Sequence, residues 1–202
     1  IDSVPVATVY AGEVSHVRPL REMLRFTRLL FRTLASPARL RAPSPAPTPP
    51  RQRTPMFFLT NDDGIHATGI AYLEKAVQPL GDVWVVAPDR ERSNISMAIT
   101  IDKPLRAHRH GENRYAIDGT PVDCVDMAIG ELLPETPALC LSGINMGQNL
   151  GHDVLFSGTV AAARKATFLG VPSIAFSMPW ISGQRDVWHL ETAESIVRNV
   201  VE

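Results

Sequence analysis

Short apolar runs alternate with stretches of helical periodicity from residue 56 onward. Four runs have the length and composition of buried parallel strands, at residues 56–60, 83–87, 138–141 and 171–176. Apolar residues at helical spacing lie between or after them, at residues 70–77, 121–133, 160–169 and 187–202. The first strand, helix and second strand form a βαβ unit, so the pattern predicts an α/β fold built on a parallel sheet.

One segment departs from this parallel pattern. Residues 99–118 alternate polar and apolar positions around a His-Gly-Glu-Asn sequence, which predicts an antiparallel β-hairpin inserted into the sheet. His108 and His110 lie on one face of this hairpin, because alternate strand residues share a face. They are either a pair of metal ligands or part of an exposed polar face, and we favour the exposed face.

The first apolar run ends in two adjacent carboxylates, Asp62 and Asp63, followed by Gly64. Ligands of open α/β sheets bind at the carboxyl ends of the strands. Two half-buried carboxylates repel each other and lose hydration there, and a divalent cation is the simplest positive partner. Asn, Asp and Gly also favour ordinary turns, so residues 61–64 alone leave both a turn and a metal site open.

Two further loops follow predicted strands. The polar loop at residues 88–98 follows the second strand and should lie next to Asp62 in the sheet. Residues 142–156 are rich in Gly and Asn, and a loop of this length within a compact domain is usually functional. It leads into Ser157-Gly158-Thr159, where two hydroxyls and free backbone N–H groups meet the positive end of a helix. This tripeptide predicts an anion site, a helix N-cap, or both.

Composition narrows the function classes. Residues 1–55 contain nine arginines and three acidic residues, so the net charge of −1 for the whole chain leaves −7 for residues 56–202. An acidic domain is poorly suited to nucleic acid, whose phosphates attract basic surfaces. No apolar run has the length needed to span a bilayer. Cys124 and Cys140 fit neither a disulfide framework nor a zinc site, and we expect both to be small buried hydrophobic residues.

The first 55 residues differ from the remainder. Arginines spaced three and four apart within residues 17–35 predict a basic amphipathic helix, which is typical of a membrane-surface segment or an organelle transit peptide. Residues 42–55 form a proline-rich spacer. We favour the interpretation that residues 1–55 are a disordered or non-native leader. The domain then comprises residues 56–202, and we expect it to be C-terminally truncated, because its last helix stops without a terminating signal.

Several short motifs follow one another along the domain. They are Thr60–Ala67 (TNDDGIHA), Val86–Arg90 (VAPDR), Arg92-Ser93, Gly119–Pro121 (GTP), Ser142–Asn145 (SGIN), Asn149–Gly151 (NLG) and Phe156–Ala162 (FSGTVAA). In order and spacing they closely resemble the SurE family, the survival-protein nucleotidases, over about residues 56–179. The resemblance implies a Rossmann-like, mostly parallel sheet with helices on both faces and the inserted hairpin.

The resemblance also implies an activity. We expect a cytoplasmic, metal-dependent 5'-nucleotidase that hydrolyses nucleoside 5'-monophosphates to nucleoside and phosphate, with 3'-monophosphates as a candidate second substrate. The family further implies a homodimer or homotetramer, built partly by the C-terminal region, and neither nucleic acid nor a membrane as a partner of the domain.

Matching motif to motif carries the family's functional residues onto this chain. The metal ligands fall on Asp62, Asp63, Ser93 and Asn145. All four supply oxygen, which agrees with one Mg²⁺ or Mn²⁺ per subunit rather than zinc. The expected reaction is in-line attack of a metal-activated water on the phosphoryl group.

Further roles are expected for residues near these ligands. The predicted catalytic residues are Asp62, Asp63, Asn61 and His66, and the predicted phosphate-binding residues are Asn61, Ser157, Gly158 and Thr159. Asn61 is expected to orient the phosphate or the water. His66 either assists proton transfer or has a structural role at the start of the helix.

The chain departs from the family at residues 94–98, which read Asn-Ile-Ser-Met-Ala. Many members have Gly after the serine, and Asn or His followed by Ser near Met97 and Ala98. Because Met97 and Ala98 cannot replace those hydrogen bonds, the rate or the substrate range is left open. Thr68 stands where the family usually has Pro, a change that a helix N-terminus should tolerate.

Two other functions are alternatives to a metal-dependent nucleotidase. A phosphatase with an aspartyl nucleophile needs two aspartates separated by one residue, which the adjacent Asp62 and Asp63 do not provide. The remaining alternative is a nucleotide-binding or structural homologue with little turnover.

Overall fold

Six strands form one sheet in the order β3-β4-β2-β1-β5-β6. The strands are β1 (Met56–Thr60), β2 (Asp82–Pro88), β3 (Ala107–Gly111), β4 (Arg114–Ile117), β5 (Leu139–Met146) and β6 (Ser173–Met178). All neighbours pair in parallel except β3 and β4, which form the antiparallel hairpin. This computed structural model describes residues 54–179 and 189–202, which belong to one compact unit, residues 51–202. The predicted leader lies outside the described residues, apart from residues 54 and 55.

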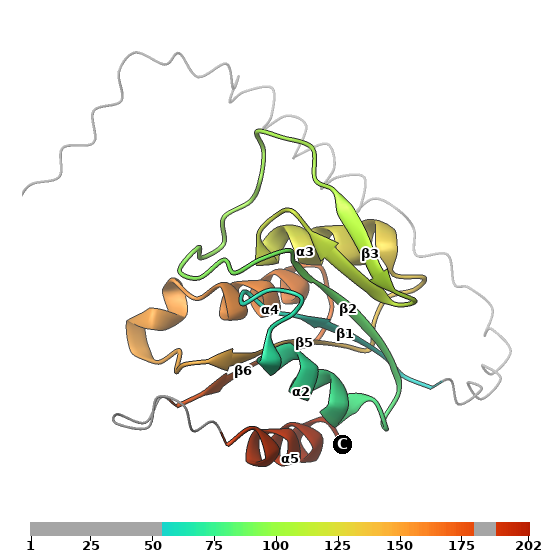
Figure 1. The fold of residues 1–202 in the computed structure, drawn as a ribbon, viewed down its shortest axis with the longest axis vertical. Coiled ribbons are helices and arrows are strands. Elements are labelled where there is room, and N and C mark those ends of the chain that lie inside the picture. Colours follow the sequence, from blue (N-terminus) through green and yellow to red (C-terminus); the bar gives the residue numbers. More distant parts are fainter. Residues whose placement is uncertain (1–53, 180–188) are drawn as a thin grey trace, which may run out of the picture. The chain divides into compact units, whose positions relative to one another are not determined.

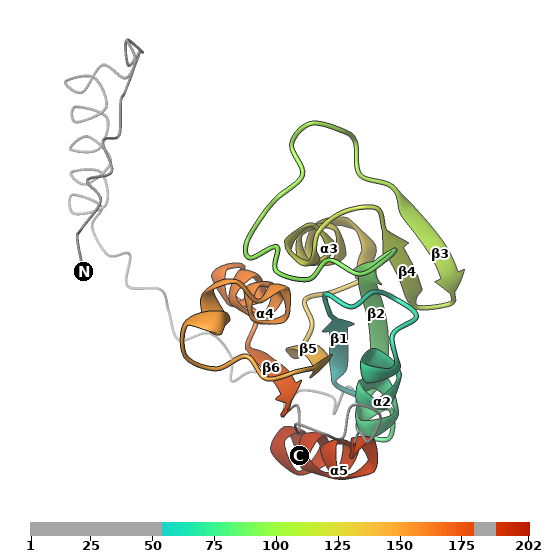
Figure 2. The ribbon, with the colours of Figure 1, turned by 60° about the vertical axis from the view of Figure 1, so that its left-hand side comes forward.

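Helices cover both faces of the sheet. They are α2 (Thr68–Val77), α3 (Pro121–Met127), α4 (Gly158–Phe168) and α5 (Leu190–Val201), with a π-helical turn η1 (Ala128–Leu132) and a 3-10 turn η2 (Gly151–Leu155). Helices α2 and α5 lie together on one face, and α3 and α4 pack side by side on the other (Figures 1 and 2). The predicted α/β fold with a mostly parallel sheet and an inserted hairpin is therefore confirmed.

Alternation along β1 explains the two layers. Phe57 and Leu59 belong to the apolar cluster beneath α2, whereas Phe58 belongs to the cluster beneath α3 and α4. Successive strand residues point to opposite faces, so a strand covered on both sides is apolar throughout, and all five residues of β1 are buried. No helix among the described residues has the length and apolar character to cross a bilayer.

The start of α3 holds the segment between β2 and β3 in place through Asp123. Thr120 and Asp123 form a capping box, in which the Thr120 hydroxyl accepts from the Asp123 amide and the Asp123 carboxylate accepts from the Thr120 amide. The same carboxylate accepts from both the amide and the hydroxyl of Thr100, at 3.0 and 2.6 Å. Asp123 therefore anchors the residues between β2 and the hairpin.

The two cysteines behave as expected. Cys124 on α3 and Cys140 on β5 are free thiols that are buried in the same apolar cluster. Burial holds the pKa of each thiol above its usual value, so both stay protonated and uncharged.

The structure corrects two element boundaries. Residues 99–106 contain no strand, so the hairpin is shorter than the pattern predicts and begins at Ala107. The predicted loop at residues 142–156 is also wrong in extent, because β5 continues to Met146 and five of the following residues form η2. Pairing of Asn145 with Ser177 and of Met146 with Met178 on β6 extends the strand past a register shift.

Candidate active site

The turn that leaves β1 is held by the side chain of Asn61. This side chain is fully buried, and its Nδ2 donates to the carbonyl oxygen of Gly64 at 3.0 Å while its Oδ1 accepts from the Gly64 amide at 3.1 Å. Gly64 has a φ of 103°, and a Cβ there would lie 3.1 Å from the backbone of Arg90. Asparagine and glycine thus form a tight turn that displays the two residues between them.

Asp62 is buried against the start of α4. The residue is only 4% exposed, and its Oδ1 accepts a hydrogen bond from the Thr159 hydroxyl. A Cβ on Gly158 would lie 2.7 Å from the Cβ of Asp62, so only glycine permits this approach. Burial raises the pKa of Asp62, and the hydroxyl and amide of Thr159 and the amide of Gly158 offset part of that rise.

Asp63 has less support than its neighbour. Its Oδ2 is buried and has no hydrogen-bond partner among the described residues. Burial raises the pKa of Asp63 to about 6, with further contributions from the nearby charges of Asp62 and Glu91, and the amide of Met146 offsets them in part. An ionised Asp63 is therefore costly until a positive charge approaches it.

Ser93 and Asn145 present oxygen atoms from two other strand ends. The Ser93 hydroxyl donates to Oε1 of Glu91 at 2.7 Å, which leaves the lone pairs of its oxygen as acceptors. Asn145 lies near the end of β5, and its Nδ2 donates to the carbonyl oxygen of Gly147 at 2.9 Å. The amide nitrogen is thereby fixed in place, and Oδ1 remains available to a ligand.

These side chains meet at a cavity of about 570 Å³ at the carboxyl edge of the sheet. Its lining residues are Asp62, Asp63, Glu91, Ser93, Asn94, Asn145, Met146, Gln148, Asn149, Asp153, Phe156 and Ser157. They come from the end of β5, from the segments that follow β1, β2 and β5, including η2, and from the N-cap of α4. Four are carboxylates, and within the described part of the chain no Arg, Lys or His joins them in the lining.

Comparison with known proteins decides the family. The family model for the survival protein SurE matches residues 57–202. The chain belongs to the SurE family. The resemblance seen in the separate motifs is thereby confirmed, and it extends over almost the whole of the predicted domain.

Individual SurE proteins are similar to this chain over part of their length. A 5'-nucleotidase SurE of Pelobacter propionicus is 57% identical over 122 residues, which is 60% of this chain and 49% of that protein. One from Vibrio cholerae serotype O1 (El Tor Inaba N16961) is 49% identical over 147 residues, 72% of this chain and 56% of that protein. The crystal structure of SurE from Aquifex aeolicus superposes with a TM-score of 0.68 at 40% identity, covering 73% of this chain and 58% of that one. This chain therefore spans about half the length of the curated SurE relatives that it matches.

The structure brings together five of the residues predicted for a SurE site. Asp62, Asp63, Ser93, Asn145 and Ser157 all line the cavity, although they lie far apart in the sequence. Their convergence follows from the strand order, because β2 and β5 flank β1 on its two sides.

The other predicted residues do not line this cavity. Asn61 uses its amide within the turn, and Thr159 uses its hydroxyl on Asp62. Gly158 lies behind Asp62, and the exposed His66 contacts the ring of His110 on the hairpin. Their predicted contacts with substrate stay predictions.

Sequence reasoning missed two carboxylates of the cavity, Glu91 and Asp153. Glu91 lies in the polar loop after β2, and Asp153 lies in the segment after β5 that was expected to be functional. Both loops were therefore identified, but residue type and spacing alone did not separate these two acids from ordinary solvated ones.

The lining residues fit a hard divalent cation. Carboxylate, hydroxyl and amide oxygens are the ligands that Mg²⁺ and Mn²⁺ prefer, and no imidazole or thiol adjoins them in the lining residues that the structure describes. The buried Oδ2 of Asp63 is a ligand atom with an unmet need for a positive partner.

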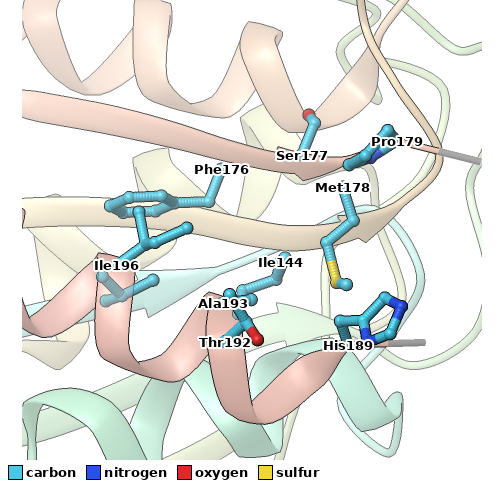
Figure 3. A pocket seen from close by; sticks show the side chains of 10 residues that line it. Ile144, Phe176, Ser177, Met178, Pro179, His189, Thr192, Ala193 and Ile196 are labelled. Atoms are coloured by element: carbon cyan, nitrogen blue, oxygen red, sulfur yellow. The ribbon is translucent and has the colours of Figure 1, made fainter.

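A second cavity, of about 250 Å³, is of a different kind. It lies between the end of β6 and α5, where Phe176, Met178 and Ile196 supply apolar walls and Thr192 and His189 lie at the rim (Figure 3). Its surface offers few polar groups for a phosphate. Pro179 and His189 both line it, and the residues between them in the sequence lie outside the described residues, so we assign it no ligand.

Proposed function

We propose that the cavity at the carboxyl end of β1 is the active site of a metal-dependent phosphomonoesterase that hydrolyses nucleoside 5'-monophosphates to nucleoside and phosphate. The observation that carries this proposal is the buried, unpaired oxygen of Asp63 within a cavity of four carboxylates. The SurE relatives named 5'-nucleotidase supply the substrate class.

Four residues would hold one Mg²⁺ or Mn²⁺ per subunit: Asp62, Asp63, Ser93 and Asn145. When bound, the cation supplies a charge that polarises a phosphoryl oxygen and lowers the pKa of a water. The protein keeps these ligands in place through outer hydrogen bonds, since the Thr159 hydroxyl donates to Asp62 and the Ser93 hydroxyl donates to Glu91.

Ser157 is the strongest candidate for contact with the phosphoryl group. It lines the cavity as the N-cap of α4, and its Oγ accepts from the amide of Val160 at 3.2 Å. The positive end of this helix favours an anion at the same place. In the structure the amides of Gly158 and Thr159 serve Asp62, so we propose that they act on the phosphate indirectly, by holding that carboxylate.

Asn61 and His66 do not line the cavity, and a catalytic role of His66 in proton transfer stays a prediction. Asn61 shapes the turn that displays both aspartates, and a direct contact with phosphate remains a prediction. The 3'-monophosphates, the cytoplasmic location and assembly as a homodimer or homotetramer are likewise predictions that rest on the family resemblance.

The direct test is phosphate release from a panel of nucleoside 5'- and 3'-monophosphates with Mg²⁺, with Mn²⁺ and with excess chelator. We expect metal-stimulated release from 5'-monophosphates, abolished by chelator and by Asp63→Asn. Asp102→Asn is the matched control, because Asp102 is exposed and does not line the cavity.

The alternative function gives a different result. A nucleotide-binding or structural homologue would bind the nucleotides but release no phosphate with either metal, and that outcome would replace the enzyme with a binding protein. Full activity in Asp63→Asn would instead move the reaction away from this cavity.

A further inference from the structure

Two histidine rings from separate elements meet outside the cavity. His66 lies just before α2, and His110 lies in β3 on the hairpin. Their ring centroids are 5.1 Å apart and their planes are inclined by 70°. Both side chains are exposed to solvent, and neither lines the oxygen-rich cavity.

Hydrogen bonds of Arg114 link the two elements that carry the histidines. Arg114 on β4 donates from Nη2 to the carbonyl oxygen of Ile65 at 2.7 Å, directly before His66. From Nη1 it donates to Oε2 of Glu74 on α2 at 2.6 Å. One arginine therefore ties the hairpin to both the start and the body of α2, which lowers the entropy cost of a ligand that must contact both histidines.

The separation of the rings matches shared coordination of one metal ion. Two imidazoles that bind Zn²⁺ through nitrogens about 2.0–2.1 Å from the metal, at a tetrahedral angle, have ring centroids about 5 Å apart. The observed separation of 5.1 Å matches that value. An edge-on contact between two rings is also ordinary packing, and the titration described below distinguishes the two.

Nearby charges do not prevent cation binding. The charge of Arg114 is balanced by the carboxylate of Glu74. The Arg109 guanidinium donates to the carbonyl oxygens of Gly111 and Glu112, within its own turn. Arg114 therefore adds no uncompensated charge, whereas Arg109 keeps its positive charge beside His110 in the sequence. Both imidazoles are exposed, where water and salt screen that charge.

We propose that His66 and His110 form a second metal site, which binds a borderline transition-metal ion such as Zn²⁺ and shares no ligand with the cavity. Imidazole nitrogen suits Zn²⁺, Ni²⁺ and Cu²⁺, whereas Mg²⁺ and Mn²⁺ prefer the oxygen ligands of the cavity. Among the described residues no group of three His, Cys, Asp or Glu gathers to hold a metal, so water completes the coordination. Such a site is open and is emptied readily by a chelator.

Occupation of this site would clamp the hairpin to the start of α2. His66 follows Asp63 by three residues, so the clamp acts on the turn that carries both aspartates. A ligand that binds only the folded chain raises its stability, so Zn²⁺ should raise the melting temperature through this link.

The experiment is a calorimetric titration of the metal-free protein with Zn²⁺, followed by thermal unfolding with and without the ion. We compare the unaltered chain with His66→Asn, His110→Asn and the control His152→Asn, which removes an exposed histidine elsewhere. Each pair variant should lose one equivalent of Zn²⁺, or bind it at least about tenfold more weakly. Each should also lose the corresponding rise in melting temperature, while the control keeps both.

Three outcomes would overturn the proposal. Unchanged binding in both pair variants would leave only ring packing, loss in a single variant would exclude a shared ion, and equal loss in His152→Asn would show nonspecific binding. Melting of each metal-free variant, followed by circular dichroism, shows that any loss of binding does not come from a failure to fold.

Discussion

Adjacent aspartates occupy opposite environments at the end of β1. Asp62 accepts hydrogen bonds from Thr159 and the first turn of α4, whereas Asp63 keeps a buried oxygen without a partner. The difference follows from what each carboxylate faces, because Asp62 lies against the first turn of α4 whereas Asp63 does not. Burial raises the pKa of both, and donors from α4 offset part of that rise for Asp62, so Asp63 has the greater need for a positive ligand.

Replacement of Asp63 by Asn should stabilise the metal-free protein. The change removes a buried charge that its surroundings disfavour, so we expect the free energy of unfolding in excess chelator at mildly alkaline pH to rise by about 1 to 3 kcal/mol. Added Mn²⁺ should then stabilise the unaltered protein but not the variant. A metal-free variant that is less stable than the unaltered protein would show that the carboxylate already has a partner in solution.

The Thr159 hydroxyl should matter for stability as well as for activity. Thr159→Val keeps the side-chain volume but removes the hydroxyl that donates to the buried Oδ1 of Asp62, which costs about 1 to 3 kcal/mol. Thr159→Ser keeps the hydroxyl and should lose less than the valine variant. Urea unfolding in excess chelator measures the free energy of unfolding of both variants. Equal losses would show that the hydroxyl of Thr159 does not account for the stabilisation.

Among the elements, α4 is the one whose position decides the cavity. It carries Ser157 and Thr159 toward the strand ends, and it approaches β1 so closely that a Cβ on Gly158 would lie 2.7 Å from that of Asp62. Steric exclusion of a Cβ, rather than helix propensity, therefore requires glycine at the first residue of α4.

Substitution of that glycine tests this approach. Gly158→Ala should destabilise the protein by about 1 to 3 kcal/mol through overpacking, although alanine is the better helix former by about 1 kcal/mol. Gly130→Ala in η1 is the matched control, since a Cβ there meets nothing within 4 Å, and it should be neutral or stabilising. If both variants melt alike, the close approach of α4 to β1 is not maintained in solution.

Elements were easier to predict than their ends. The apolar run of β1 and the helical stripe of α2 were predicted correctly. Burial on both faces of a strand gives a continuous apolar run, and burial on one face of a helix gives apolar residues three and four positions apart. The extension of β5 through Asn145 could not be predicted, since its polar residues depend on pairing with β6 across a register shift. The five cavity residues were predicted through family motifs, while Glu91 and Asp153 needed the structure.

At the scale of the whole molecule, the chain divides between Pro50 and Arg51. All four proposed metal ligands lie in the second unit, residues 51–202, together with both layers of helices. A unit with its own core is expected to fold without the segment that precedes it.

Removal of residues 1–50 should therefore leave the domain intact. We expect an unchanged melting temperature and unchanged metal-stimulated phosphate release, because residues 51–202 form a compact unit with its own core. Circular dichroism and the phosphate assay measure the two quantities. Aggregation of the shortened chain, or loss of its activity, would show that the first segment contributes to the fold.

The strand order has an implication for how such a protein can diverge. The chain leaves β1 toward β2 and β4 on one side and returns to β5 and β6 on the other, so the connecting loops part directly above β1. The place of the hollow follows from the winding, while the loops and α4 supply its lining. Substitutions such as those at residues 94–98 can therefore accumulate without moving the hollow, and they change the rate or the range of molecules that it accepts. A lineage with this topology can exchange one substrate for another through loop mutations while its framework is inherited unaltered.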